Sequence, residues 1–158
     1  MKVFGMDFTS KKWHERYLGL AKEVSTWSKD PSTKVGVVAV GSKGQVLSQG
    51  YNGFPRRIHD SKERLQDRDT KYKYVVHAEM NCVYNASYNG VSLDGATMYV
   101  YGLPICSECA KGIIQTGISR VVMPKQIVPE KWRESWKLSM QMFKEADIEF
   151  KLIDYKGE

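Results

Sequence analysis

The pattern of hydrophobic and polar positions predicts alternating helices and strands along most of the chain. Apolar residues recur at helical spacing over 13–27, and a proline-containing polar stretch ends that pattern. Residues 35–40 form a short run rich in β-branched side chains, typical of a buried strand, and turn residues connect it to a second strand over 46–51. Further along, we expect helices over 75–87, 107–116 and 130–146, and strands over 97–101, 118–123 and 148–153.

The order of these elements predicts the fold class. Strands that alternate with helices favour a three-layer α/β/α fold around one mixed sheet of five strands. The strands should be antiparallel in the first hairpin and parallel where a helix intervenes. Residues 53–72 interrupt the alternation with a polar, highly charged stretch, which we interpret as a surface excursion that is partly helical around 61–69. At this length, we expect residues 1–158 to form a single domain.

Composition narrows the class of protein. The chain is 42% hydrophobic and 27% charged, values that suit a globular protein with a packed core. No stretch approaches the roughly 20 consecutive apolar residues of a membrane span, and charges near the N-terminus interrupt any signal-peptide core. We therefore expect a cytoplasmic protein with no membrane partner. The net charge of +6 is compatible with either a nucleic acid or a phosphorylated small molecule as ligand.

Cys106 and Cys109 form a C-x-x-C motif, which carries the clearest chemistry in the chain. In a reducing cytosol such a motif indicates a redox pair or metal ligands rather than a disulfide staple. The elements of a thioredoxin-like fold do not precede it in the expected order, and a zinc ribbon would need a second C-x-x-C that the sequence lacks. These two observations favour a catalytic metal site.

His77 and Glu79 strengthen that interpretation, because they flank a small residue at the start of a predicted helix. One imidazole and two thiolates would give zinc three ligands and leave its fourth tetrahedral position open for water, as in a catalytic site. A carboxylate beside that water can carry protons to a substrate. The third cysteine, Cys82, lies about 140° from His77 on an ideal helical wheel, so we interpret it as a core residue.

Four stretches, in order, resemble the zinc-dependent cytidine/deoxycytidylate deaminase family, and in particular its deoxycytidylate (dCMP) deaminases. They are SKDPSTKVGVVAV (28–40), GYNGFPR (50–56), HAEMN (77–81) and CSECAKGIIQTGISRVV (106–122). The elements H-x-E and P-C-x-x-C are the signature of zinc-dependent nucleobase deaminases. The resemblance covers roughly residues 13–122 and implies a cytidine-deaminase-like fold.

The resemblance implies hydrolytic deamination of dCMP to dUMP and ammonia, which supplies thymidylate synthesis. It implies that His77, Cys106 and Cys109 hold a catalytic zinc and that Glu79 moves protons. The residues that it assigns to the substrate are Asn52, Ala78, Ser107 and, near the 5′-phosphate, Ser28 and Lys29, with Lys34 as a weaker candidate.

Regulation is a further expectation from the resemblance. Members of this family are often hexamers that dCTP activates and that dTTP inhibits together with Mg²⁺. The effector site in such enzymes uses the G-Y-N-G segment and its neighbours at a subunit interface. The candidate effector contacts in this chain are Gly53, Phe54, Arg56 and Arg57.

The chain also departs from the family pattern. Ile105 separates Pro104 from the first cysteine, which bears on the loop over the base rather than on the zinc ligands. Residues 56–74 contain no cysteine and a single histidine, so we expect one zinc per chain rather than a second, structural one. Many relatives cover the substrate with a tyrosine near the C-terminus, for which Trp132 or Trp136 is the candidate substitute here.

Two other functions fit parts of the sequence. A tRNA adenosine deaminase shares H-A-E and C-x-x-C and would suit the basic charge, but GYNGFP and HAEMN fit the deoxynucleotide branch better. A zinc-stabilised module could bind nucleic acid through residues 56–73, but it would have no need of Glu79 beside the metal. We therefore expect dCMP as the ligand and no nucleic-acid partner.

Overall fold

A mixed sheet forms the centre of the computed structural model, which describes residues 2–3 and 6–157. β3 is antiparallel to both β4 and β5, whereas β5, β6 and β7 are parallel. This arrangement confirms the predicted mixed sheet of five strands. The strands lie in the order β4 (Val46–Tyr51), β3 (Gly36–Val40), β5 (Thr97–Tyr101), β6 (Arg120–Pro124) and β7 (Glu149–Ile153).

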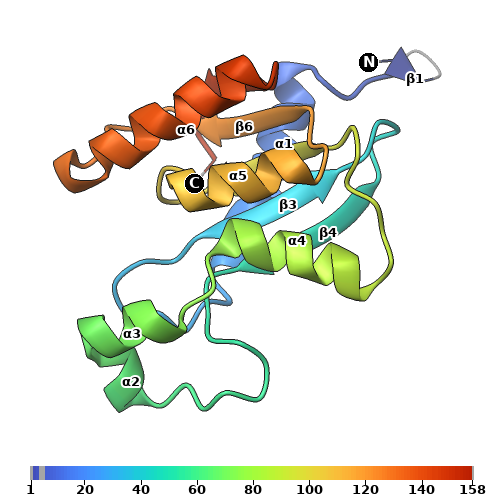
Figure 1. Ribbon diagram of the computed structural model, residues 1–158. Coiled ribbons are helices and arrows are strands. Elements are labelled where there is room, and N and C mark those ends of the chain that lie inside the picture. Colours follow the sequence, from blue (N-terminus) through green and yellow to red (C-terminus); the bar gives the residue numbers. More distant parts are fainter. Residues whose placement is uncertain (1, 4–5, 158) are drawn as a thin grey trace.

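Helices cover both faces of this sheet and make the three predicted layers (Figure 1). α1 (Lys11–Ser25) packs on one face, where Leu18 meets Val38, Tyr99 and Val122. The opposite face carries α4 (Ala78–Tyr88), α5 (Ser107–Gln115) and α6 (Arg133–Glu145). Because side chains alternate along a strand, neighbouring residues of β3, β5 and β6 contribute to opposite cores. The core on the second face includes Val37, Met98, Val121, Cys82, Ile113 and Phe143.

Three helical segments differ from the expected ones. The helix expected over 75–87 begins only at Ala78, because His77 has extended backbone angles and caps it. The helix expected over 130–146 is divided into a short 3₁₀ helix, η1 (Glu130–Trp132), followed by α6. The polar excursion contains two short helices, α2 (Lys62–Gln66) and α3 (Arg68–Tyr74), where partial helicity was expected only around 61–69.

A short antiparallel hairpin near the N-terminus was not expected from the sequence. It consists of β1 (Lys2–Val3) and β2 (Met6–Asp7). Strands of two residues are too short to show the alternation by which a strand is recognised.

The carboxyl ends of β4 and β5 meet the start of β3 at one edge of the sheet, since Gly36 pairs with both Tyr51 and Tyr101. The segments that follow β4 and β5 lead to the N-termini of α4 and α5. α2 and α3 project beyond this edge, away from the body of the fold (Figure 1). Ligands of α/β folds bind at such an edge, outside the carboxyl ends of the strands.

Close packing of β4 against α4 sets the position of the α4 N-terminus. A Cβ atom on Gly50 would lie 2.3 Å from the backbone nitrogen of Cys82 and 2.7 Å from the carbonyl oxygen of Ala78. The strand and the helix can approach this closely because residue 50 has no side chain. The Ser48 hydroxyl adds a hydrogen bond to α4, donating to the Cys82 carbonyl at 2.7 Å.

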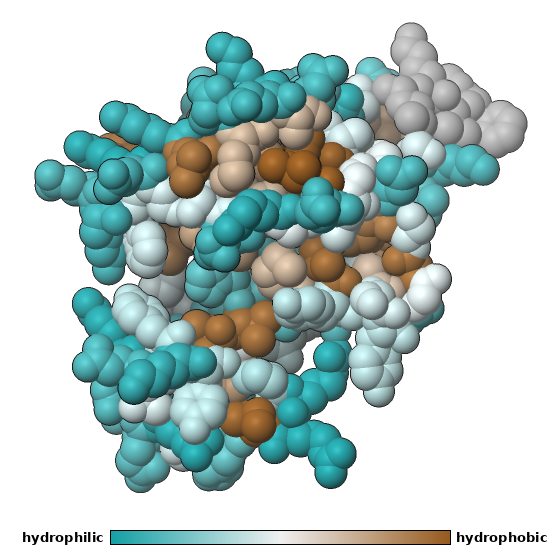
Figure 2. All heavy atoms as spheres, viewed as in Figure 1, coloured by the Kyte–Doolittle hydropathy of each residue, from teal (hydrophilic) through white to brown (hydrophobic). Residues whose placement is uncertain are grey.

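The outer surface is largely polar. Hydrophilic side chains cover most of α6 and of the α2–α3 segment on the face seen in Figure 2, with smaller hydrophobic patches between the elements. Within the described residues, no helix combines the length and the apolar character that crossing a membrane would require.

Candidate active site

Three metal-ligating side chains converge at the N-termini of α4 and α5. His77 caps α4, Cys106 caps α5, and Cys109 lies one turn into α5. The Nδ1 atom of His77 is 3.4 Å from the Cys106 sulfur and 3.3 Å from the Cys109 sulfur. Among the described residues this is the only group of three such side chains whose ligand atoms lie within 4.8 Å of one another.

The local environment favours an anionic sulfur at Cys106. Its pKa falls to about 4, first because the Cys109 side chain donates a hydrogen bond to it and then because His77 does. The backbone N–H of Cys109 donates to the same sulfur at 3.4 Å, and the positive end of the α5 dipole lies there as well. The same contacts raise the pKa of Cys109 and of His77. A site with one nitrogen and two sulfurs, one of them readily ionised, has the donor set that zinc prefers.

Glu79 lies in the first turn of α4, two residues after His77, and is only 4% exposed. Burial raises the pKa of this carboxyl to about 7. A carboxyl group with a pKa near neutrality can both accept and donate a proton under physiological conditions. Its position beside the three ligands therefore suits general acid–base chemistry.

A cavity of about 340 Å³ lies beside this group, and His77, Glu79 and Cys106 help to line it. Its volume lies in the range typical of small-molecule sites. Six parts of the chain form its wall: the loop before β3, the segment at the end of β4, α3, the segment that leads into α4, the segment that leads into α5, and η1. The site is therefore a concave pocket of a size that suits a small molecule.

Asn52 and Ala78 line this cavity, as their predicted role requires, and Trp132 of η1 does too. The Asn52 side chain also holds the loop before β3, because its Oδ1 accepts the N–H of Val35 at 2.8 Å and its Nδ2 donates to the Thr33 carbonyl at 2.9 Å. The structure brings Asn52 to the site largely as an organiser of that loop.

The remaining predicted substrate residues do not line the cavity. The Ser28 hydroxyl donates to the Asn52 carbonyl at 2.8 Å, and the Lys34 ammonium donates to the Ser28 carbonyl. Lys29 points elsewhere and pairs with Asp60 at 3.1 Å. The N–H of Ser107 donates to the Ser135 hydroxyl of α6 at 2.8 Å.

Comparison with known proteins identifies the family. The family model described as "Cytidine and deoxycytidylate deaminase zinc-binding region" matches residues 11–125. The chain belongs to the cytidine and deoxycytidylate deaminase family.

Individual members agree with this assignment. The chain is 39% identical over 140 residues to an "Uncharacterized deaminase in luxG 3'region" of Aliivibrio fischeri, covering 87% of this chain and 91% of the relative. It is 35% identical over 147 residues to the deoxycytidylate deaminase of Mus musculus, covering 89% and 79% of the two chains.

The fold of this deaminase-family chain matches solved structures as well. The crystal structure of the dCMP deaminase from cyanophage S-TIM5 in complex with dCMP and dUMP superposes with a TM-score of 0.74, at 21% identity, over 92% of this chain and 99% of that one. At this identity the match establishes the fold, and it confirms the predicted cytidine-deaminase-like α/β architecture.

The residue inserted into the deaminase signature is accommodated by the core. The Ile105 side chain is fully buried, and its carbonyl accepts a hydrogen bond from the Ser139 hydroxyl of α6 at 2.9 Å. Pro104 remains on the wall of the cavity. Ser135 and Ser139 thus anchor the segment that presents Cys106, a role that the sequence interpretation missed. The only trace in the sequence is a pair of serines four residues apart on an amphipathic helix.

The third cysteine and the two candidate tryptophans also have defined positions in the structure. Cys82 is fully buried in the core of this deaminase fold and lies outside the ligand group, as expected. Trp136 packs against Phe150 with 5.3 Å between ring centroids, so of the two candidate tryptophans only Trp132 borders the cavity.

Of the four predicted effector residues, Gly53 and Phe54 help to line a second cavity of about 140 Å³. Arg56 lies outside it, donating to the Asn85 side chain with its guanidinium 5.2 Å from the Tyr88 ring centre. Arg57 adopts a left-handed backbone conformation with φ of 70°. The effector role of these four residues stays a prediction.

Proposed function

We propose that this chain catalyses the hydrolytic deamination of dCMP to dUMP and ammonia. The observation that carries the proposal is the buried Glu79 beside three zinc-type donors at a pocket of small-molecule size. The name deoxycytidylate deaminase, borne by the mouse relative, supports cytosine nucleotides as the substrate class. The match to a zinc-binding region of cytidine and deoxycytidylate deaminases supports zinc as the metal.

The donor set fits zinc, with His77, Cys106 and Cys109 as its three protein ligands. When bound, zinc supplies the Lewis acidity that makes water a nucleophile near neutral pH. Glu79 accepts a proton from the attacking water and delivers it to N3 of the cytosine ring as oxygen adds to C4. Glu79 then carries the remaining proton of the oxygen added at C4 to the amino group, the C4–N bond breaks, and ammonia leaves as the C4 carbonyl forms.

Ammonia release measured on dCMP, CMP, dCTP and deoxycytidine tests the proposal, with a tRNA anticodon stem-loop as the substrate of the alternative adenosine deaminase. We expect turnover of dCMP and none of the stem-loop. Glu79→Gln should retain zinc and lose at least about a hundredfold in rate, because the amide cannot relay protons. Glu108→Gln is the matched control, since Glu108 is exposed on α5 and pairs with Lys111 at 2.6 Å.

Two outcomes would contradict the proposal. If the Glu79→Gln enzyme is as active as the unmodified protein, Glu79 does not relay protons. Wild type that binds zinc but releases no ammonia from any cytosine nucleotide would favour the zinc-stabilised nucleic-acid module instead.

We also propose that the enzyme supplies dUMP for thymidylate synthesis in the cytoplasm and that it is a hexamer activated by dCTP and inhibited by dTTP with Mg²⁺. The resemblance to regulated family members supports this regulation, and the second cavity beside Gly53 and Phe54 offers a place for an effector. The dCMP saturation curve tests the proposed regulation directly. We expect a sigmoidal curve that dCTP makes hyperbolic, and a hyperbolic curve insensitive to both triphosphates would contradict it.

A further inference from the structure

Three basic side chains gather on the cavity wall formed by α3 and η1. Arg68 and Lys71 come from α3, and Lys131 comes from η1, more than fifty residues later in the chain. Only two acidic residues line the same cavity, and one of them, Glu79, belongs to the metal end. The part of the cavity wall formed by α3 and η1 therefore carries an excess of positive charge.

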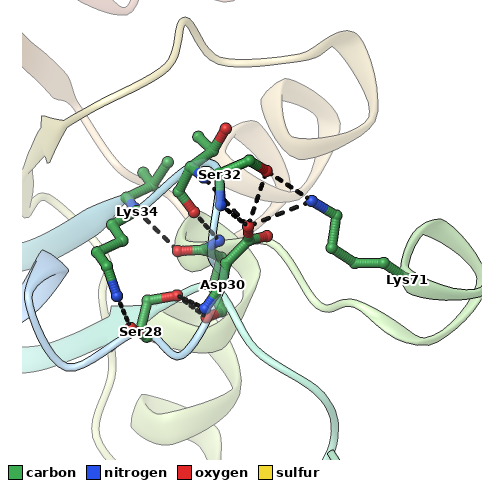
Figure 3. Close-up of polar contacts among 8 residues, drawn as sticks. Ser28, Asp30, Ser32, Lys34 and Lys71 are labelled. Atoms are coloured by element: carbon green, nitrogen blue, oxygen red, sulfur yellow. Dashed lines mark hydrogen bonds and ion pairs between the residues drawn. The ribbon is translucent and has the colours of Figure 1, made fainter. Parts of the chain in front are cut away.

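Lys71 is a buried member of this group, 7% exposed, and its ammonium has a fixed place (Figure 3). It donates to the Asp30 carboxylate at 3.2 Å and to the Ser32 hydroxyl at 2.9 Å. An ammonium group has three N–H donors, so these two contacts leave one for a ligand in the cavity. Asp30 is likewise engaged, since the same oxygen accepts the backbone N–H groups of Ser32 and Thr33.

Arg68 and Lys131 are exposed and form no ion pair among the side chains that the structure describes. Lys131 contacts the neighbouring Trp132, with its ammonium 5.3 Å from the ring centre. Both charges are therefore free to meet an anion. By contrast, Lys29 is paired with Asp60, and Lys34 bonds to the Ser28 carbonyl, away from this cavity.

We infer that the phosphomonoester of the substrate binds between α3 and η1, held by Arg68, Lys131 and the remaining N–H of Lys71. The inference rests on the proposed function and replaces Ser28 and Lys29 as the phosphate contacts. A guanidinium and two ammonium groups suit a phosphate dianion, whose charge-assisted hydrogen bonds are stronger than neutral ones. The buried Lys71–Asp30 pair supplies a rigid support, and the two exposed cations select a ligand that carries the phosphate.

The test compares kcat/KM for dCMP with that for deoxycytidine, which lacks the phosphate. Arg68→Gln and Lys131→Gln should each lower kcat/KM for dCMP by roughly ten- to a hundredfold, with turnover of deoxycytidine unchanged. Lys73→Gln on α3 and Lys125→Gln after β6 are the matched controls, because both lysines are exposed and neither lines the cavity. Both controls should keep the wild-type preference for dCMP.

Lys29→Gln distinguishes the two possible phosphate contacts. If Lys29→Gln lowers the efficiency on dCMP while Arg68→Gln and Lys131→Gln leave it intact, the inference is wrong. It is also wrong if both cavity variants lose dCMP and deoxycytidine turnover equally, since that result indicates a structural role.

Calorimetric titration with dUMP and deoxyuridine separates this inference from the proposed function. Wild type that deaminates neither substrate, but binds dUMP more tightly than deoxyuridine through Arg68 and Lys131, would overturn the function and support the phosphate site. Wild type that deaminates dCMP and deoxycytidine equally well, with no effect of either variant, would overturn the phosphate site and leave cytosine deamination in place.

Discussion

Acid should destabilise this protein through His14, a buried histidine on α1, which packs on the face of the sheet opposite α4 and α5. His14 is 1% exposed on α1, with its Nδ1 atom 2.8 Å from the Tyr99 hydroxyl. Its Nε2 atom is buried and has no hydrogen-bond partner among the described residues. Burial is the main reason that its pKa falls to about 4. The charged groups that act on it are Lys151 and Arg120, which lower the pKa, and Glu149 and Asp7, which raise it.

The sign and size of the effect follow from proton linkage. The unfolded chain takes up a proton near the ordinary pKa of 6.5, whereas the folded protein does so only near 4. The free energy of unfolding therefore falls as the pH drops through this interval. The linkage relation gives a loss of about 2 kcal/mol between pH 7 and pH 5, and about 3 kcal/mol in full below pH 4.

Urea unfolding at pH 7 and pH 5 measures this loss in the wild type and in His14→Asn. The asparagine keeps an amide near the Tyr99 hydroxyl but cannot be protonated. Between pH 7 and pH 5, the free energy of unfolding of this variant should therefore fall by about 2 kcal/mol less than that of the wild type. Groups at the metal site titrate in every variant and cancel in the difference. His59→Gln is the control, since His59 is exposed, and it should behave like the wild type. Equal losses in His14→Asn and wild type would refute the argument.

Three further predictions concern the metal, the helix that carries it and the buried ion pair. Cys109→Ala should lower the zinc content, measured by atomic absorption, from one per chain toward zero, whereas Cys82→Ala should keep one zinc despite a looser core. Gly50→Ala should lower the free energy of unfolding by about 1–3 kcal/mol in urea, because the new Cβ would lie 2.3 Å from an α4 backbone nitrogen; an unchanged midpoint would show that α4 can shift freely. Lys71→Met removes the cation that pairs with the buried Asp30 carboxylate and should cost about 3–5 kcal/mol. Adding Asp30→Asn should recover part of that loss in the same assay, and no recovery would contradict the pairing.

The elements of the sheet were predictable because their signals are local. The strand expected over 97–101 has those bounds in the structure, and the strand expected over 46–51 does too. A run of β-branched or aromatic residues between turn residues is enough to mark such a strand. The division of the long helix into η1 and α6 was not predictable, since the apolar spacing continues across Arg133 and only the backbone hydrogen bonding changes there.

α3 shows a second reason why part of the fold could not be predicted from the sequence. Its residues, RDTKYKY, carry charges on every side, so no apolar stripe marks it as a helix. The helix nevertheless buries Lys71 against Asp30, forty-one positions earlier. A charged residue normally indicates solvent exposure, so a buried ion pair between distant segments leaves no pattern in the sequence.

The candidate site likewise has one part that local sequence spacing predicts and another part that only the fold reveals. The grouping of His77, Glu79, Cys106 and Cys109 could be predicted because their spacing is itself the chemical requirement: one helix start carries the histidine and the carboxyl group, and another carries the two cysteines. The contacts for the rest of a substrate depend on which loops meet at the sheet edge, and only the fold decides that. Family resemblance placed the phosphate near Ser28 and Lys29, whereas those side chains are engaged with Asn52 and Asp60.

The insertion of Ile105 shows how the fold protects the ligands from local sequence change. An extra residue between Pro104 and Cys106 could have shifted the first cysteine away from His77. Instead the isoleucine side chain enters the core, and Ser139 of α6 fixes its carbonyl. Ser135 of the same helix accepts the N–H of Ser107, so the residues on both sides of Cys106 are tied to α6. α6 lies after the four stretches that carry the family resemblance, yet it sets the position of a ligand, and substitutions at its two serines should therefore act on metal binding before they act on the fold.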